Sequence, residues 1–343
     1  MENISIEYYF TFTTKYDKII YIILFFKNEV KSMSKYIILP DVTCDLSKEL
    51  RDYFGLEDYI MGYVQINGNS IKTRLDWENI SKDEFYKTLS NKKNQVSSAA
   101  GTPEDYYQTF KKYVELGYKV ISMSISSKIS GTFSIASLAA KRVKEEINDA
   151  EIYCLDTTRM SGSFGLLVCY ALELQKEGKS FEEVINYLEE TKSKVHQMGP
   201  IDDLTFVARR GQISKGKAIM GNFAGIKPMG DSNTDGYVTV LAKVKGIKKA
   251  MDATVEYVKS LAVDLENQYL LIMHSDRDNY ANLLKEKFEA SCNFKKVFVS
   301  DVFSGCGTNI GPGMICAYFL GNPVTSDLQF EKETLASAIE KIA

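Results

Sequence analysis

The chain has 343 residues, a hydrophobic content of 45% and a formal net charge of −3. That length and apolar content are enough for a large core and for two domains. The slightly acidic balance gives no support to nucleic-acid binding, which usually requires a basic surface. Six scattered cysteines without a Cys-x-x-Cys pair, and only two histidines, argue against a disulfide framework and against a metal centre.

The first 32 residues differ from the rest of the chain. Residues 19–26 form an apolar run, which is much shorter than the roughly 20 residues that a membrane-spanning helix needs. No small-residue cleavage site follows it, as a signal peptide would require. We expect residues 1–32 to be an extension that precedes a normal start at Met33, or else an arm that touches a membrane transiently. The protein is expected to be cytoplasmic, without stable membrane insertion.

From Met33 onward, strand and helix patterns alternate. A short buried strand is expected at 36–39, and a helix starts after Thr102, a capping residue that is followed by Pro103 and two acids. Further expected elements are a strand at 120–125, a helix with apolar positions from 133 to 147, a strand at 152–155 and a helix after Ser161. This β-α order predicts a parallel sheet with helices on both faces, whose ligands collect at the carboxyl ends of the strands.

A second, smaller α/β domain is predicted after a helix at 181–195. Its expected elements are a hairpin at 225–229 and 237–241, a helix at 250–263, a strand at 269–273, a helix at 279–290, a strand at 296–300 and a terminal amphipathic helix at 326–343. The predicted architecture is therefore a three-layer α/β domain at 33–195 and a C-terminal α/β domain at 196–343.

The most informative segment is Ile-Ser-Ser-Lys-Ile-Ser-Gly-Thr at 125–132, between a predicted strand and a predicted helix. The first turn of that helix presents free N–H groups, the hydroxyls of Ser130 and Thr132, and the positive end of the helix dipole, a combination that binds anions. The alternative is that Ser130 only caps the helix.

This segment resembles a signature of the DegV family, bacterial proteins that hold one long-chain fatty acid. Four other blocks resemble family motifs in the same order. They are Asp-Val-Thr-Cys-Asp-Leu at 41–46, Ser-Ala-Ala-Gly-Thr-Pro-Glu-Asp-Tyr at 98–106, Asp-Asp-Leu with Gly-Gln-Ile-Ser at 202–214, and Gly-Thr-Asn-Ile-Gly-Pro-Gly at 307–313. The resemblance extends from about residue 33 to residue 321 and implies a DegV-like fold with a lipid site between the two domains.

The resemblance implies that Ser98 and Ser130 hold the fatty-acid carboxylate, with Gly131 and Thr132 beside them. Ser97 is the alternative to Ser98, because the first block can be aligned one residue differently. The acyl chain would lie in a tunnel between the domains, and the residues proposed to line it are Phe164, Leu166, Leu167, Ile219, Phe223 and Ile226. Each of these apolar residues could equally belong to the ordinary core.

Three departures from the family pattern concern the head group. Gln212 stands where the family has an arginine, Asn309 where it has a histidine, and Val42 where it has a serine. Glutamine and asparagine can donate hydrogen bonds but carry no positive charge. Arg209 or Arg210 could supply that charge from the same loop.

Two glycine-rich segments could be mistaken for nucleotide sites. The segment at 211–218 matches the P-loop spacing, but it ends in Ala218 where a magnesium-binding Ser or Thr is needed. The segment at 305–311 misses the dinucleotide fingerprint, and we expect it to form a tight turn at Pro312 where the backbone approaches its neighbours closely. No cofactor is therefore expected.

The resemblance implies a lipid-binding protein that is not itself an enzyme. It would present a fatty acid to a separate ATP-dependent fatty acid kinase, which forms acyl-phosphate for phospholipid synthesis. One alternative is a lipid sensor or carrier without a kinase partner. The other is a small-molecule-binding enzyme related to dihydroxyacetone kinases, which bind their substrates through a histidine that has no counterpart near Ser98 or Ser130.

Overall fold

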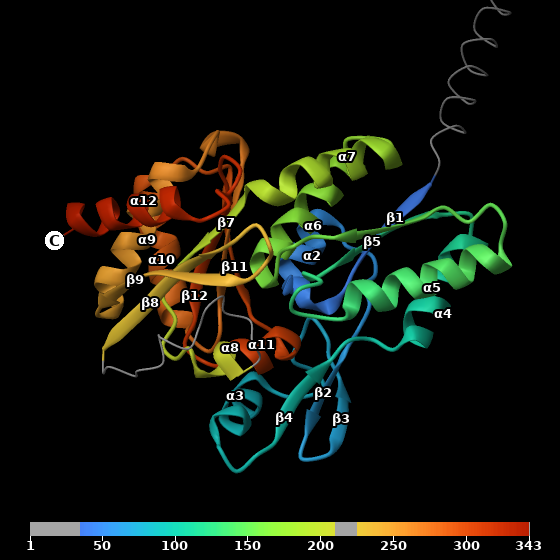
Figure 1. Ribbon diagram of the computed structural model, residues 1–343, viewed down its shortest axis with the longest axis horizontal. Coiled ribbons are helices and arrows are strands. Elements are labelled where there is room, and N and C mark those ends of the chain that lie inside the picture. Colours follow the sequence, from blue (N-terminus) through green and yellow to red (C-terminus); the bar gives the residue numbers. More distant parts are fainter. Residues whose placement is uncertain (1–34, 210–224, 343) are drawn as a thin grey trace, which may run out of the picture. The chain divides into compact units, whose positions relative to one another are not determined.

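The computed structural model describes residues 35–209 and 225–342, and from Tyr36 onward the chain forms one compact unit (Figure 1). The N-terminal extension lies outside the described residues, as do Arg210, Gln212, Ile219, Phe223 and the side chain of Arg209. Among the described helices, none combines the length and the apolar character that crossing a bilayer requires.

The first sheet is parallel and has the strand order β1-β5-β6. Its strands alternate their apolar side chains between two faces: Ile37 and Val120 pack beneath α4 and α5, whereas Ile38 and Ile121 pack against α6. The predicted parallel sheet with helices on both faces is confirmed. The elements of this part are β1 (Tyr36–Pro40), β5 (Lys119–Ser124), β6 (Ile152–Asp156), α2 (Lys48–Phe54), α4 (Pro103–Glu115), α5 (Thr132–Glu146), α6 (Ser161–Lys176) and α7 (Phe181–Thr191).

The second sheet has the order β11-β10-β12-β7 and is mixed, because β12 runs antiparallel to both of its neighbours. One face packs on helices α9, α10 and α12, and the opposite face contributes Leu271, Met273 and Tyr318 to the core that contains α6. The elements are β7 (Val195–Met198), α9 (Ile247–Leu261), β10 (Tyr269–His274), α10 (Asp278–Ser291), β11 (Lys296–Asp301), β12 (Ile315–Leu320) and α12 (Gln329–Lys341).

Helix α6 belongs to the cores of both sheets. Its first twelve residues are all buried, and a helix that is buried on every side is expected to be small or apolar throughout. Two glycines permit this packing: a Cβ at Gly162 would lie 2.3 Å from the Tyr318 ring, and a Cβ at Gly165 would lie 2.4 Å from the Cys44 carbonyl oxygen. A side chain at either glycine position would therefore push α6 away from its neighbours.

Two smaller β-structures complete the fold. An antiparallel sheet of order β3-β2-β4 is covered by α3, and the hairpin β8–β9 turns at Asn233–Gly236. The remaining elements within residues 35–209 and 225–342 are β2 (Tyr63–Ile66), β3 (Asn69–Lys72), α3 (Lys82–Ser90), β4 (Val96–Ala99), α8 (Thr205–Arg209), β8 (Ile226–Ser232), β9 (Val238–Lys245), α11 (Ser304–Ile310) and 3-10 turns at Val42–Cys44, Lys192–Lys194 and Leu265–Asn267.

Two sequence expectations were wrong in detail. The glycine-rich segment at 305–311 forms helix α11 and not only a turn, because burial against α3 and β4 overrides the low helix propensity of glycine. Its glycines do allow close approach, since a Cβ at Gly307 would lie 2.9 Å from Phe85. The helix expected at 181–195 ends at Thr191, and Val195 already begins β7. The division into domains at residue 195 stays a prediction.

Candidate functional site

The loop between β5 and α5 places two hydroxyl groups at the carboxyl edge of the first sheet. Strand β5 ends at Ser124 and α5 starts at Thr132, with Gly131 at the N-cap and no side-chain cap. The Ser130 and Thr132 hydroxyl oxygens lie 2.7 Å apart, and Ser130 Oγ accepts a 3.3 Å hydrogen bond from the Thr132 N–H. The expected helix N-terminus is present, and the N-cap position belongs to Gly131 instead of Ser130.

Ser98 reaches the same region from β4. Asn309, on α11, donates a 2.9 Å hydrogen bond from Nδ2 to Ser98 Oγ. Successive side chains of a strand point to opposite faces, so Ser97 and Ser98 lie on different faces of β4. The structure thus brings Ser98 and Asn309 together from positions that are 211 residues apart.

Ser98, Ser130 and Thr132 line one cavity of about 40 Å³, which we call the hydroxyl cavity. Neither Ser97 nor Gly131 lines it. This volume is enough for a small polar group but not for an acyl chain.

Asp41 forms one wall of the hydroxyl cavity and is 5% exposed. One carboxylate oxygen accepts a 2.9 Å hydrogen bond from the Ile125 N–H, and the other accepts from the N–H and the hydroxyl of Thr43. Burial raises the pKa of Asp41, and these hydrogen bonds offset part of the rise. A second carboxyl group in this cavity would favour keeping one proton between the two acids.

Tyr106 is also one of the residues that line the hydroxyl cavity. The side chain is 1% exposed, and its hydroxyl has no hydrogen-bond partner within residues 35–209 and 225–342. Burial raises the pKa of Tyr106 well above its usual value, and the charge of Asp41 raises it further, so the phenol keeps its proton and can donate. Residue spacing at the start of α4 gave no sign that the Tyr106 hydroxyl is unpaired, so the sequence did not single out this residue.

A comparison with protein families identifies the family of this chain. The family model described as "Uncharacterised protein, DegV family" matches residues 35–321. The chain belongs to the DegV family. The resemblance found in the five sequence blocks is thereby confirmed.

Individual DegV relatives match over nearly their whole length. A DegV domain-containing protein of Clostridium perfringens is 29% identical over 293 residues, which cover 84% of this chain and 99% of the relative. The solved structure of a DegV family protein of Thermus thermophilus, reported for its fatty acid binding, has 24% identity, a TM-score of 0.75 and coverage of 84% and 99%. A DegV family structure from Ruminococcus gnavus with vaccenic acid has 20% identity, a TM-score of 0.73 and coverage of 84% and 100%.

A second cavity of this DegV chain, which we call the apolar cavity, lies between α8, α11 and the β8–β9 hairpin and holds about 70 Å³. Its wall includes the methionines Met160, Met229 and Met314. Helix α11 borders both cavities, with Gly305 at the hydroxyl cavity and Ile310 at the apolar one. Gly305 and Ile310 are five residues apart, which corresponds to about 8 Å along the helix axis.

Four of the residues predicted to line an acyl tunnel fall within the described part of the chain. Phe164, Leu166 and Leu167 are fully buried in the core around α6, and Ile226 begins β8. None of the four lines the apolar cavity. Their contact with an acyl chain stays a prediction.

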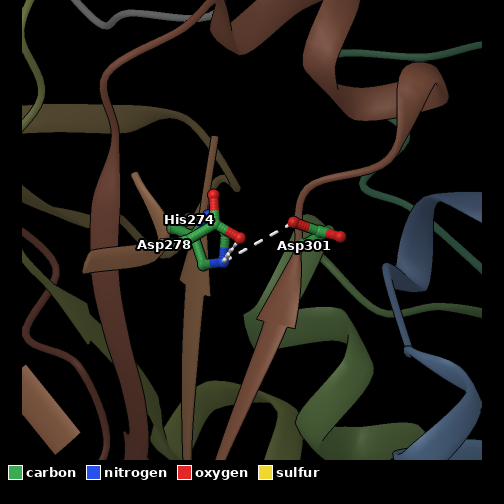
Figure 2. A group of neighbouring side chains, drawn as sticks. All are labelled: His274, Asp278 and Asp301. Carbon is green, nitrogen blue, oxygen red and sulfur yellow. Dashed lines mark ion pairs between the residues drawn. The ribbon is translucent and has the colours of Figure 1, made fainter. Parts of the chain in front are cut away.

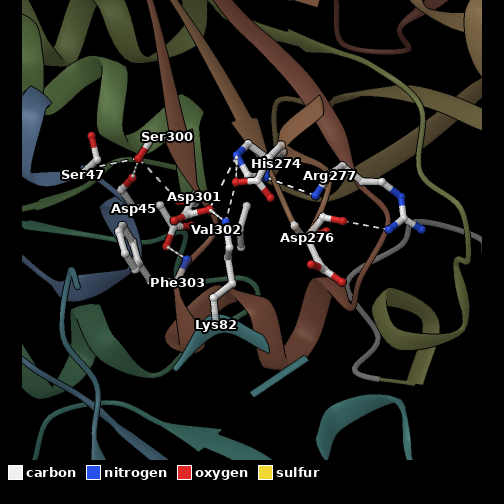
Figure 3. A network of polar contacts seen from close by, with 12 residues as sticks. Asp45, Ser47, Lys82, His274, Asp276, Arg277, Ser300, Asp301, Val302 and Phe303 are labelled. Carbon is white, nitrogen blue, oxygen red and sulfur yellow. Dashed lines mark hydrogen bonds and ion pairs between the residues drawn. The ribbon is translucent and has the colours of Figure 1, made fainter. Parts of the chain in front are cut away.

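One cluster of metal-ligand type lies away from both cavities. His274 Nε2 lies 3.8 Å from Asp278 Oδ1 and 3.5 Å from Asp301 Oδ1, and the three side chains face one another (Figure 2). The Lys82 ammonium reaches the same carboxylates at 2.5 and 3.2 Å, as Figure 3 shows for Asp301.

The hydrogen bonding of His274 also disfavours a metal. The Arg277 N–H points to His274 Nδ1 at 3.3 Å, so in the neutral ring the proton resides on Nε2, the atom that a metal would need. Burial lowers the pKa of His274, which keeps the ring neutral. Lys82 supplies the positive charge that the two carboxylates require, and we assign no metal to this cluster.

Proposed function

We propose that this chain binds one long-chain fatty acid, with its carboxylate in the hydroxyl cavity. Ser98 and Ser130 act as donors from two different elements, and the N-terminus of the 15-residue helix α5 favours a negative charge. Thr132 is hydrogen-bonded to Ser130 and Asn309 to Ser98, so both orient the primary donors. Charge-assisted hydrogen bonds of this kind offset the cost of burying a carboxylate.

The observation that carries the proposal is the unpaired Tyr106 hydroxyl. A buried hydroxyl without a partner is costly, and Tyr106 is one of the residues that line the cavity together with Ser98 and Ser130. A carboxylate in the cavity accepts from Tyr106 and removes that cost. Tyr106 thus compensates in part for the uncharged Asn309.

The apolar cavity is the proposed site of the acyl chain. About 15 methylene groups at about 0.8 kcal/mol each supply on the order of 12 kcal/mol before the costs of association. A chain of this length needs more room than about 70 Å³. Methionine side chains reorient readily, and the three in the cavity wall are the ones expected to turn aside. The fatty acid binding reported for the Thermus thermophilus DegV protein and the vaccenic acid in the Ruminococcus gnavus structure support the binding of a fatty acid by this chain.

We further propose that the bound fatty acid is presented to a separate ATP-dependent fatty acid kinase, a role that the family resemblance suggests. The proposal assigns no catalytic step to this chain. The kinase would transfer phosphate to the carboxylate at the hydroxyl cavity and leave acyl-phosphate for phospholipid synthesis.

Native mass spectrometry of the purified protein, followed by identification of the released lipid, tests the binding. We expect one C14–C18 fatty acid per chain and, for Ser130→Ala, an affinity lower by on the order of tenfold to a hundredfold, as for the loss of one charge-assisted hydrogen bond. Ser134→Ala, at an exposed position of α5, is the matched control and should bind normally. An empty protein that takes up no added fatty acid, or unchanged binding in Ser130→Ala, would contradict the proposed site.

Tyr106→Phe distinguishes the effect of the Tyr106 hydroxyl on stability from its effect on the affinity for fatty acid. The ligand-free variant should be at least as stable as the wild type, because an unpaired buried hydroxyl is lost, while its affinity for fatty acid should fall. Tyr107→Phe serves as a control, because the Tyr107 hydroxyl already pairs with Glu146 at 2.5 Å.

A phosphorylation assay with a fatty acid kinase from the same organism tests only the presentation of the bound fatty acid. Binding without phosphorylation would favour a lipid carrier.

A further inference from the structure

Arg159 is a buried arginine in which only one of the three guanidinium nitrogens donates hydrogen bonds to residues that the structure describes. It lies in the loop between β6 and α6 and is 1% exposed. Its Nη1 donates to the carbonyl oxygens of Thr158 at 3.0 Å and Asn233 at 3.4 Å. Nε and Nη2 are buried, and within the described parts of the chain they have no hydrogen-bond partner. These two atoms share the edge of the guanidinium that forms paired hydrogen bonds with carboxylates and phosphates.

The nearby acid does not neutralise this edge. Asp231 Oδ1 accepts from the N–H groups of Gln197 at 2.9 Å and Ser232 at 2.7 Å. Its Oδ2 lies 2.8 Å from His196 Nδ1 and accepts from the Tyr257 hydroxyl at 3.1 Å. Both oxygens of Asp231 are therefore occupied, and its charge acts on Arg159 only from a distance.

The surroundings of Arg159 favour an additional anion. Two residues later begins α6, a 16-residue helix whose N-terminus carries partial positive charge. The buried hydroxyls of Ser124 and Ser232 are also without partners among the described residues. Both belong to this region: the Ser124 carbonyl accepts from Thr157, and Ser232 precedes Asn233.

The tip of the β8–β9 hairpin covers this site. Asn233 reaches Arg159 through its carbonyl, and Gly236 packs against Ser126 so closely that a Cβ would lie 2.3 Å from the serine hydroxyl. Thr234 and Asp235, at the turn, are exposed. Solvent therefore reaches this turn but not Arg159 beneath it.

We propose that Arg159 binds a small oxyanion, a carboxylate or a phosphate, on the Nε–Nη2 edge of its guanidinium. The guanidinium keeps its charge at neutral pH, because burial lowers the pKa of Arg159 only to about 10. The anion could be a free ion or the head group of a second lipid, because both present two oxygens that can accept hydrogen bonds from Nε and Nη2. The site is separate from the hydroxyl cavity and does not depend on the fatty-acid proposal.

Thermal denaturation of the delipidated full-length protein tests the site. Phosphate is raised from about 0.1 to about 10 mM while sodium chloride keeps the ionic strength constant, and the midpoint temperature should rise with phosphate in the wild type. Arg159→Met should abolish this rise. Arg159→Lys, which keeps the charge but loses the paired edge, should need at least about tenfold more phosphate. Arg142→Met, at an exposed arginine, is the matched control and should respond like the wild type.

A second arm distinguishes the source of the anion. With excess fatty acid labelled with ¹³C at its carboxyl carbon, a lipid head group at this site gives an additional NMR signal that persists in Ser130→Ala and disappears in Arg159→Lys. A phosphate response without that signal identifies a free ion. If the phosphate response of both Arg159 variants equals that of the wild type and no additional signal appears, the site does not exist. If Arg159→Met fails to fold, Arg159→Lys decides.

Discussion

Replacing Asp45 by asparagine tests whether one buried carboxyl group makes the stability of this fold depend on pH. Asp45 has no exposed surface; its Oδ2 accepts a 2.6 Å hydrogen bond from the Ser161 hydroxyl, and its Oδ1 accepts a 3.0 Å bond from the Phe303 N–H (Figure 3 draws the latter). The backbone of Asp45 is left-handed, with φ of 53°, a conformation that asparagine also tolerates. The substitution therefore removes the titration while keeping the shape.

The expected magnitude follows from the pKa of Asp45. Burial raises this pKa from 3.8 to about 7, and the hydrogen bonds offset only part of the rise. Because the folded state holds the proton more tightly, the group stabilises the fold most below about pH 4 and loses that contribution as the pH rises to about 7. Between about pH 5 and about pH 8 the loss is about 3 kcal/mol, since each pKa unit corresponds to about 1.4 kcal/mol.

Urea unfolding followed by circular dichroism at both pH values measures the effect. The difference in unfolding free energy between Asp45→Asn and the wild type should move in favour of the variant by about 3 kcal/mol from about pH 5 to about pH 8. Asp52→Asn, at an exposed acid of α2, should follow the wild type. If the difference between Asp45→Asn and the wild type stays constant with pH, the reasoning about Asp45 is refuted.

Two further predictions concern the polar cluster and the apolar cavity. Lys82→Met removes the cation between Asp278 and Asp301 and should raise the pKa of His274. The reason is that burial, as the largest cause, and the charge of Lys82 both lower this pKa. An NMR titration of the His274 ring with an unchanged midpoint would contradict this expectation. Val240→Phe adds volume to the wall of the apolar cavity and should shift the bound fatty acids to shorter chains or empty the site, as read by mass spectrometry of the released lipid. Lipids unchanged in Val240→Phe would place the acyl chain elsewhere.

Local sequence patterns predicted much of the fold. The predicted start of α4 is present as a capping box between Thr102 and Asp105 with Pro103 in the first turn. The strand and helix around residue 130 also lie where periodicity placed them. Such signals depend on neighbours within a few residues, so they can be read from one sequence. Strands β2, β3 and β4 were not anticipated, because each is four residues long and mostly not buried, so it lacks the apolar pattern of a core strand. Strands β7 and β12 were also missed, because they are short and pair with strands that are distant in sequence.

The candidate site was predictable only in part. The family resemblance named Ser98 and Ser130, and the structure places both in one cavity. The resemblance left Ser97 as an alternative to Ser98, and the pleat of β4 turns the two side chains to opposite faces. The unpaired state of the Tyr106 and Arg159 donors had no sequence signal, because a missing partner is a property of the three-dimensional surroundings.

The sequence by itself determined the β-α alternation of the first sheet, the helix start beside Ser130 and membership of the DegV family, because these depend on short-range periodicity, capping and motif spacing. Only the tertiary structure decided that α6 is shared by two sheets and that Asn309 meets Ser98. It also decided that Asp41 and Tyr106 share a cavity with the two serines. These contacts join residues far apart in the chain, and whether a polar group is buried and unpaired depends on how all the surrounding elements pack.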